Sequence, residues 1–246
     1  MTELDGRTAL VTGASGHLGG AVCRALAAQG ARVVGTYRGG AERIQALADE
    51  YGVIPHQVDL SDGTAVAGLL PAMTEVAGAL DILVCAHGVT ERRPVVTARP
   101  GSDAGDLWRL NVSASVALAG AAGRQMLRRR HGRIVLLGSR AGTHGMPGQA
   151  DYAASKAALS AWATSAAWEL GPFGVTVNVV APGAVEPDPQ APAVYSDREN
   201  QEVVGRIALR RLGAPAEVAA VVAFLAGPGA GYLTGQTLLV DGGARW

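Results

Sequence analysis

Short runs of Val, Ile and Leu alternate with longer amphipathic stretches along almost the whole chain. The runs are apolar at consecutive positions, which is typical of strands buried on both faces of a parallel sheet. They occupy residues 8–12, 31–36, 53–58, 80–85, 133–137, 175–180 and 237–240. Helices are expected at about 18–29, 41–51 and 150–170, after Asp62, and in a long stretch that ends near Arg130. The alternation predicts one α/β domain over residues 1–246, with about seven parallel strands and helices on both faces.

Composition argues against several classes of protein. Hydrophobic residues make up 48% of the chain and charged residues 17%, so the chain can bury enough apolar surface to fold. The 21 basic and 21 acidic residues balance, which gives no overall field that would favour nucleic acid or an anionic membrane. Cys23 and Cys85 lack the spacing of a zinc site, and no apolar run is long enough to span a membrane. We therefore expect a cytoplasmic protein without a metal site.

A glycine-rich turn directly follows the first predicted strand. It reads Thr-Gly-Ala-Ser-Gly-His-Leu-Gly over residues 12–19. Glycines in such a turn let the backbone approach a pyrophosphate, and the following helix offers its N-terminal N–H groups to the phosphates. The turn therefore predicts a Rossmann fold that binds a dinucleotide. The alternative is a packing role alone, because the chain contains 34 glycines.

The end of the second predicted strand bears on which dinucleotide is bound. An acidic residue there would bind the adenosine ribose and repel a 2′-phosphate. The segment at 35–39 has no acid, so Arg38 is expected to bind the 2′-phosphate of NADP(H), unless it is an ordinary surface arginine. Asp59 and Leu60 follow the third strand and are expected to contact the adenine. Asp59 could equally cap the helix that follows.

A tyrosine and the only lysine of the chain lie four residues apart in a predicted helix. Tyr152 and Lys156 would share one face of it, one turn apart. An ammonium beside a phenol favours the phenolate and brings the phenol pKa toward the range of acid–base catalysis, although a chance helix pair is the alternative. The other 20 basic residues are arginines, which are fixed cations and could not serve equivalently. Ser139 could polarise a carbonyl, and Asn111 could hold a water for proton supply.

Together these motifs resemble the short-chain dehydrogenase/reductase family, and within it the 3-oxoacyl-(acyl-carrier-protein) reductases. The resemblance extends from about residue 7 to residue 243. It includes the turn at 12–19, YAASK at 152–156, VTVNVVAPG at 175–183 and YLTGQTLLVDGG at 232–243. The combination is more specific than any single motif.

The resemblance also implies a role for each residue of the site. Tyr152 would donate a proton to the substrate oxygen, Lys156 would bind the nicotinamide ribose, and Ser139 would orient the carbonyl. Asn111 would anchor the water that resupplies the proton. The residues expected to bind NADP(H) are Gly13, Ser15, Gly16, His17, Leu18, Gly19, Arg38, Asp59, Leu60, Ala86, Gly88, Tyr152, Lys156, Pro182, Gly183 and Val185.

Three positions depart from the pattern of the family. Ala-His-Gly at 86–88 stands where the family usually has Asn-Ala-Gly, and His87 is expected to be a packed substitute rather than a titrating group. Pro187 stands where the family often has a Thr that contacts the carboxamide. Phe173 stands where acyl-carrier reductases commonly have a second arginine, which argues against carrier docking.

The resemblance implies NADPH-dependent reduction of a 3-oxoacyl thioester on acyl carrier protein, in fatty-acid or polyketide synthesis, by a homotetramer. The irregular stretch at about 184–210 is expected to form a substrate flap. Arg129 and Arg130 are expected to dock the acidic carrier, unless they only stabilise a helix end. Two other functions stay open. One is an NADP-linked dehydrogenase of a free alcohol, sugar or polyketide-ring ketone, and the other is a non-catalytic NADPH-binding sensor, against which the four catalytic residues argue.

Overall fold

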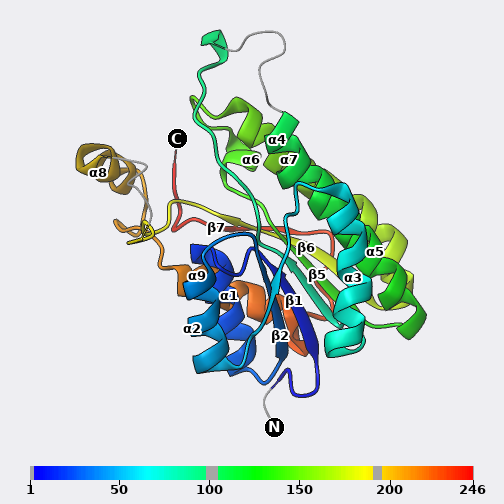
Figure 1. Cartoon of the computed structure of the whole chain (residues 1–246). Coiled ribbons are helices and arrows are strands. Elements are labelled where there is room, and N and C mark those ends of the chain that lie inside the picture. The colour runs from blue at the N-terminus through cyan, green and yellow to red at the C-terminus, as the bar shows by residue number, and fades with distance from the viewer. Residues whose placement is uncertain (1–2, 98–104, 191–195, 246) are drawn as a thin grey trace.

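Seven parallel strands form one sheet in the computed structural model, which describes residues 3–97, 105–190 and 196–245 (Figure 1). The strands run in the order β3-β2-β1-β4-β5-β6-β7, and every neighbouring pair is parallel. They are β1 (Thr8–Thr12), β2 (Arg32–Tyr37), β3 (Ile54–Gln57), β4 (Ile82–Cys85), β5 (Gly132–Leu137), β6 (Val175–Pro182) and β7 (Thr237–Val240). The expected α/β Rossmann architecture is confirmed.

Helices cover both faces of the sheet. The α-helices of the described residues are α1 (His17–Ala28), α2 (Ala41–Tyr51), α3 (Gly63–Ala77), α4 (Gly105–Trp108), α5 (Ser115–Arg129), α6 (Ala141–His144), α7 (Ala150–Leu170), α8 (Asp197–Gly205) and α9 (Pro215–Ala226). Figure 1 shows α1, α2 and α9 on one face and α3, α5 and α7 on the other. Successive strand residues alternate between the two cores, so Ala9 and Val11 of β1 pack on the α1 side and Leu10 on the α3 side.

The sequence patterns above do not predict α9, although its start carries recognisable signals. Pro215 is the first residue of the helix, and the carboxylate of Glu217 accepts a hydrogen bond from the backbone N–H of Ala214 at 2.8 Å. Two of its most buried residues, Val222 and Leu225, belong to the same core as α1. The helix therefore completes the cover of one sheet face.

The strand order places a crevice between β1 and β4. The chain leaves β1 toward α1 and β2 on one side, whereas β4 is followed on the other side by β5. In open α/β sheets, ligands bind where the strand order reverses in this way, at the carboxyl ends of the strands. The glycine-rich turn and Ser139 both lie at this end of the sheet.

The segment after β6 leaves the sheet and returns to it. Val185 and Gly213 pair in an isolated bridge, with Glu186 N–H donating to the Gly213 carbonyl at 2.9 Å and Gly213 N–H to the Ala184 carbonyl at 3.0 Å. Between these contacts the chain carries α8, and residues 191–195 lie outside the described part. The expected flap at 184–210 coincides with this excursion.

Candidate active site

The turn between β1 and α1 has a conformation that larger residues could not adopt. Gly13 has a φ of +69°, and a Cβ at this position would lie 2.8 Å from Cα of His87. A Cβ on Gly19 would lie 2.1 Å from the Gly13 carbonyl oxygen, so α1 starts directly against the turn. The N-cap residue of α1 is Gly16, which has no side chain to occupy the first N–H groups of the helix. The turn therefore fits the pyrophosphate of a dinucleotide.

A cavity of about 260 Å³ lies beside the turn, at the carboxyl ends of β1, β2, β3 and β4. We call it the β2-side cavity. The residues that line it and are expected to bind the cofactor are Gly13, Ser15, Gly16, Arg38, Asp59, Leu60, Ala86 and Gly88. Three others, His17, Leu18 and Gly19, lie in the first turn of α1. The cavity is thus suited to the adenosine half of the cofactor.

Arg38 and Asp59 line the β2-side cavity, and both are exposed. The Asp59 carboxylate accepts hydrogen bonds from the backbone N–H and hydroxyl of Ser61, at 2.9 and 2.7 Å, which lower its pKa. The N-cap residue of α3 is instead Asp62, which accepts from the N–H of Thr64 at 2.8 Å. The alternative in which Asp59 caps this helix is therefore wrong.

A second cavity, of about 240 Å³, lies at the carboxyl ends of β5 and β6. We call it the Tyr152 cavity. Its lining includes Ser139, Tyr152, Pro182, Gly183 and Val185, all of which were expected at the site. Ser139 comes two residues after β5, and Tyr152 is in the first turn of α7. The fold therefore brings two hydroxyl groups to the loop that follows β6.

The rest of the Tyr152 cavity is largely apolar. Met146, Val203 and Leu212 contribute to its wall. The only charged side chain among its described lining residues is Arg140, which donates to Asp241 Oδ2 and to the Ala244 carbonyl, both at 2.9 Å. Because that charge is already paired, the cavity suits a substrate that is uncharged at its reacting end.

Lys156 lies one turn beyond Tyr152 in α7, on the same side of the helix. Its side chain is buried, and Nζ donates to the Leu137 carbonyl at 2.8 Å and lies 5.9 Å from the centroid of the Tyr152 ring. Burial lowers the pKa of Lys156 to about 8. The end of β5 therefore holds the lysine next to the phenol.

Asn111 lies in a π-helical segment, η2 (Arg109–Ala114), between α4 and α5. Its Nδ2 donates to the Val89 carbonyl at 2.9 Å and to Ser155 Oγ at 3.2 Å, and its Oδ1 accepts from Val89 N–H at 2.8 Å. Both N–H groups of the side-chain amide are therefore occupied. A relay water at Asn111 would have to donate a hydrogen bond to this residue rather than accept one from its amide. Nothing in the local sequence predicts the π-helix, a feature that is frequent at functional sites.

Gly88 lines the β2-side cavity at a point close to Asn111 and Lys156. A Cβ at this position would lie 3.0 Å from Oδ1 of Asn111 and 3.4 Å from Nζ of Lys156. A side chain here would therefore crowd the Asn111 amide and the Lys156 ammonium. The residues present therefore fit a dinucleotide that extends from the β2-side cavity to Tyr152.

The two arginines expected to dock a carrier protein lie far from this site. They end α5 directly before β5, whereas Ser139 follows the other end of β5. Because a strand rises by about 3.3 Å per residue, the six residues of β5 separate the two places by roughly 20 Å. A carrier docked on these arginines would therefore not lie beside Ser139 of the same chain.

Arg129 and Arg130 also differ in their contacts. Arg129 donates to the buried carboxylate of Asp81 at 2.8 Å and to the Leu80 carbonyl at 3.0 Å. Arg130 has a left-handed φ of 53°, and its guanidinium lies 6.0 Å from the ring centroid of Phe173. Arg129 therefore holds α5 to the sheet, and Arg130 is the more available of the two.

Sequence reasoning missed a link between α2 and the segment after β6. Arg43 donates to Asp188 Oδ2 at 2.6 Å and to Gln190 Oε1 at 2.5 Å, and it also approaches the Ser15 carbonyl of the turn at 3.4 Å. Arg43 and Asp188 are 145 residues apart, so no local pattern could reveal the pair. The link holds the segment after Pro187 beside the glycine-rich turn.

Other kinds of site are not found in the described part of the chain. No group of three His, Cys, Asp or Glu residues there could hold a metal ion. None of its helices is long and apolar enough to cross a membrane. Cys23 and Cys85 are buried, and burial raises the pKa of each thiol to about 12, which makes both unreactive.

Known proteins match this chain over nearly its whole length. Residues 13–245 match a family model described as "Enoyl-(Acyl carrier protein) reductase". The chain is 39% identical over 243 residues to the 3-oxoacyl-[acyl-carrier-protein] reductase FabG of Escherichia coli (strain K12), covering 98% of each. It is also 39% identical over 250 residues to Nodulation protein G of Rhizobium meliloti (strain 1021), covering 99% of this chain and 98% of the relative. A solved structure of a short chain dehydrogenase/reductase family protein superposes with a TM-score of 0.85 at 39% identity and 98% coverage of both chains.

Proposed function

Because the chain belongs to the short-chain dehydrogenase/reductase family, we propose that it is an NADPH-dependent ketoreductase. Its substrate is a 3-oxoacyl thioester on acyl carrier protein, and its product is the 3-hydroxyacyl thioester. The observation that carries the proposal is that Ser139 and Tyr152 line one largely apolar cavity, with the buried Lys156 one helical turn behind the phenol. The pathway is fatty-acid synthesis or a related polyketide synthesis.

Each residue of the chain then has a defined task. Tyr152 donates a proton to the substrate oxygen, and Ser139 donates a hydrogen bond that orients the carbonyl. The Lys156 ammonium favours the phenolate that Tyr152 becomes after the transfer. Asn111 fixes the loop at Val89 beside the site. The glycine-rich turn would hold NADPH, which would supply the hydride when bound.

A substrate panel tests the proposal. NADPH oxidation is measured with an acetoacetyl thioester, with a crotonyl thioester and with free ketones of similar size. We expect the acetoacetyl thioester to give the highest kcat/KM. Faster reduction of the crotonyl thioester would favour the enoyl reduction named in the family description. Faster reduction of the free ketones would favour a dehydrogenase of small molecules, a reading favoured also by Phe173, which stands where acyl-carrier reductases commonly have an arginine.

Replacing Arg38 should lower the preference for NADPH over NADH. Arg38 is the cation that lines the β2-side cavity, and a charge-assisted bond to the 2′-phosphate is expected to contribute about tenfold or more in affinity. We expect Arg38→Ala to lower kcat/KM with NADPH by that factor and to leave NADH unchanged. Arg32→Ala is a matched control, since Arg32 lies at the other end of β2 and donates to the Val76 carbonyl. Equal use of both cofactors by the wild type would refute the assignment.

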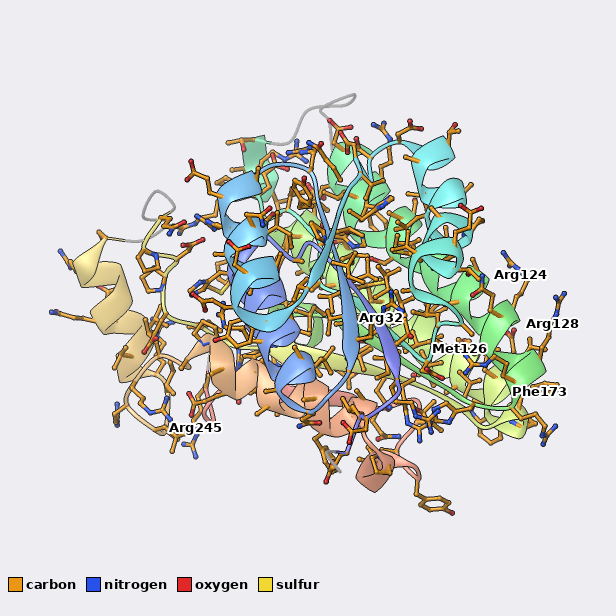
Figure 2. The ribbon with its side chains drawn as sticks, turned by 60° about the horizontal axis from the view of Figure 1, so that its bottom comes forward. Arg32, Arg124, Met126, Arg128, Phe173 and Arg245 are labelled. Carbon is orange, nitrogen blue, oxygen red and sulfur yellow. The ribbon has the colours of Figure 1, made fainter. Side chains whose placement is uncertain are left out.

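The carrier protein is proposed to dock on the exposed arginines at the end of α5. Figure 2 shows Arg124 and Arg128 projecting from this helix on the side of Phe173, with Arg245 on the opposite side of the view. Acyl carrier proteins are acidic, so these charges would speed the encounter. Since β5 separates this end from Ser139, a carrier docked here would serve the active site of another copy of the chain.

Reversing Arg128 and Arg130 to Glu should raise KM for a carrier-bound substrate. The increase should fade in high salt as the screening length falls below about 8–10 Å, and KM for an N-acetylcysteamine thioester should not change. Arg129 is left intact, because its reversal would place an acid beside the buried Asp81. Arg245→Glu is the control. If only Arg245→Glu raised KM for the carrier-bound substrate, the docking site would have to be assigned to the other side of the molecule.

We also propose a cytoplasmic homotetramer whose flap at 184–210 closes over the substrate. Support for association between copies comes from the exposed face of α7. Small residues, among them Ala154, Ala161 and Ser165, lie on that face, and Trp168 is 82% exposed. Such a face allows close packing against another helix. Support for the flap comes from Val203 of α8, which lines the Tyr152 cavity.

A further inference from the structure

We propose that His87 is a positioning residue that joins the cofactor turn to the helix segment containing Asn111. This role of His87 rests on the proposed function only in the identity of the reaction that Asn111 and the cofactor serve. His87 follows β4, at the crevice between β1 and β4, and its side chain lies between two elements of the site. Each of its ring nitrogens contacts a different one.

The first contact is with the end of β1. His87 Nδ1 lies 2.6 Å from Thr12 Oγ1, and Thr12 is the residue directly before the glycine-rich turn. The Thr12 hydroxyl also accepts a hydrogen bond from Ala86 N–H at 3.1 Å. The backbone of His87 supports the same turn, since Gly13 packs against its Cα and N. His87 therefore fixes the start of the turn from two directions.

The second contact is with the π-helical segment η2. His87 Nε2 lies 3.1 Å from the carbonyl oxygen of Leu110 and 3.3 Å from Oγ of Ser115. Leu110 directly precedes Asn111, and Ser115 directly follows η2. A π-helical turn is wider than an α-helical one and is less stable by itself. The ring contacts both ends of this turn and so holds Asn111 in place.

Burial beside the Lys156 charge favours a neutral ring, and the contacts of that ring define one tautomer. A carbonyl oxygen can only accept, so Nε2 carries the proton and donates it to Leu110. In the neutral ring Nδ1 then accepts from the Thr12 hydroxyl at 2.6 Å, a shorter contact than the 3.3 Å between that hydroxyl and the Val84 carbonyl. Burial and the nearby Lys156 charge lower the pKa of His87 to about 4, so the ring stays neutral through the physiological range. The hydrogen bonds of the neutral ring thus link β1 to the π-helical segment η2, as expected of a packed rather than a titrating histidine.

Two substitutions separate its two contacts. The amide of Asn lies two bonds from Cβ, as Nδ1 does, whereas the amide of Gln lies three bonds from Cβ, as Nε2 does. His87→Asn can therefore keep the bond to Thr12 and lose those to Leu110 and Ser115. His87→Gln can keep the bond to Leu110 and lose the one to Thr12. The pair is matched in polarity and differs only in which contact it retains.

The expected result is an opposite split between binding and turnover. Cofactor affinity is measured by fluorescence titration with NADPH alone, and kcat is measured at saturating NADPH with the best substrate of the panel. His87→Asn should lower kcat about tenfold with an unchanged Kd, and His87→Gln should raise Kd about tenfold with an unchanged kcat. Thr12→Val also removes the acceptor of Ala86 N–H, so it should raise Kd at least as much as His87→Gln does, and adding His87→Gln to it should change Kd little further.

Equal changes in Kd and kcat in both His87 variants, or a change in Tm alone, would overturn the proposal, because simple packing predicts no split. If a His87 variant fails to fold, Thr12→Val decides the cofactor contact, and a lower kcat with unchanged Kd in that variant would refute it. Since NADPH binding is measured without substrate, failure of the proposed ketoreductase activity would be seen separately, in the wild type.

Discussion

Tyr152→Phe should abolish reduction and leave NADPH binding nearly intact. The phenol hydroxyl is the proton donor that lines the cavity with Ser139, and loss of a positioned general acid costs about 10²–10⁴-fold in kcat. The ring itself is retained in the variant, so packing in α7 and the shape of the cavity should not change. The measurements are kcat with the acetoacetyl thioester and Kd for NADPH by fluorescence titration.

Tyr232→Phe is the matched control, because Tyr232 is fully exposed and removal of its hydroxyl touches nothing in the site. It should show wild-type kcat and Kd. A Tyr152→Phe enzyme that keeps more than about a tenth of the wild-type kcat would remove Tyr152 from the mechanism. A large loss of NADPH affinity would instead show that the hydroxyl serves binding.

Local sequence patterns predicted the parts of the fold that depend on local chemistry. β1, β7, α2 and α7 have the expected bounds, because apolar runs and helix periodicity are visible in the sequence itself. The spacing of Tyr152 and Lys156 likewise predicts their shared helix face. Both features need only the geometry of a single element.

The features that escaped prediction depend on contacts between distant segments. The π-helix at Asn111 is held by Val89 and His87, which lie more than 20 residues earlier in the chain. Arg129 and Arg130 look equivalent in sequence, yet only Arg129 reaches Asp81, because Arg130 leaves the helix in a left-handed conformation. Sequence alone could not separate these two roles.

Lys156→Arg should inactivate the enzyme although the charge is kept. Lys156 Nζ fits between the Leu137 carbonyl, the Tyr152 ring and the space beside Gly88. A guanidinium is wider, carries five donors and cannot lose its proton, so it cannot satisfy all of them in this buried position. We expect kcat/KM to fall by at least about 100-fold. Near-normal activity would show that the only lysine of the chain is there by accident.

Lys156→Met is the companion variant, because it keeps the length of the side chain and removes the charge. It should also be inactive, and it tests the burial of the ammonium independently of activity.

The folded protein releases the Lys156 proton at about pH 8, whereas the unfolded chain keeps it to about 10.5, so between these values the unfolded state binds more protons. The free energy of unfolding of the wild type should therefore rise by about 1 kcal/mol relative to Lys156→Met from pH 8 to pH 9. The comparison with Lys156→Met cancels the titration of Cys23, whose raised pKa destabilises both proteins alike above pH 9. It does not cancel that of Cys85, whose pKa responds to the Lys156 charge, so the curves are compared only up to pH 9. Parallel curves for the two proteins would mean that the ammonium is solvated before the cofactor binds, and that its effect on Tyr152 needs the bound cofactor.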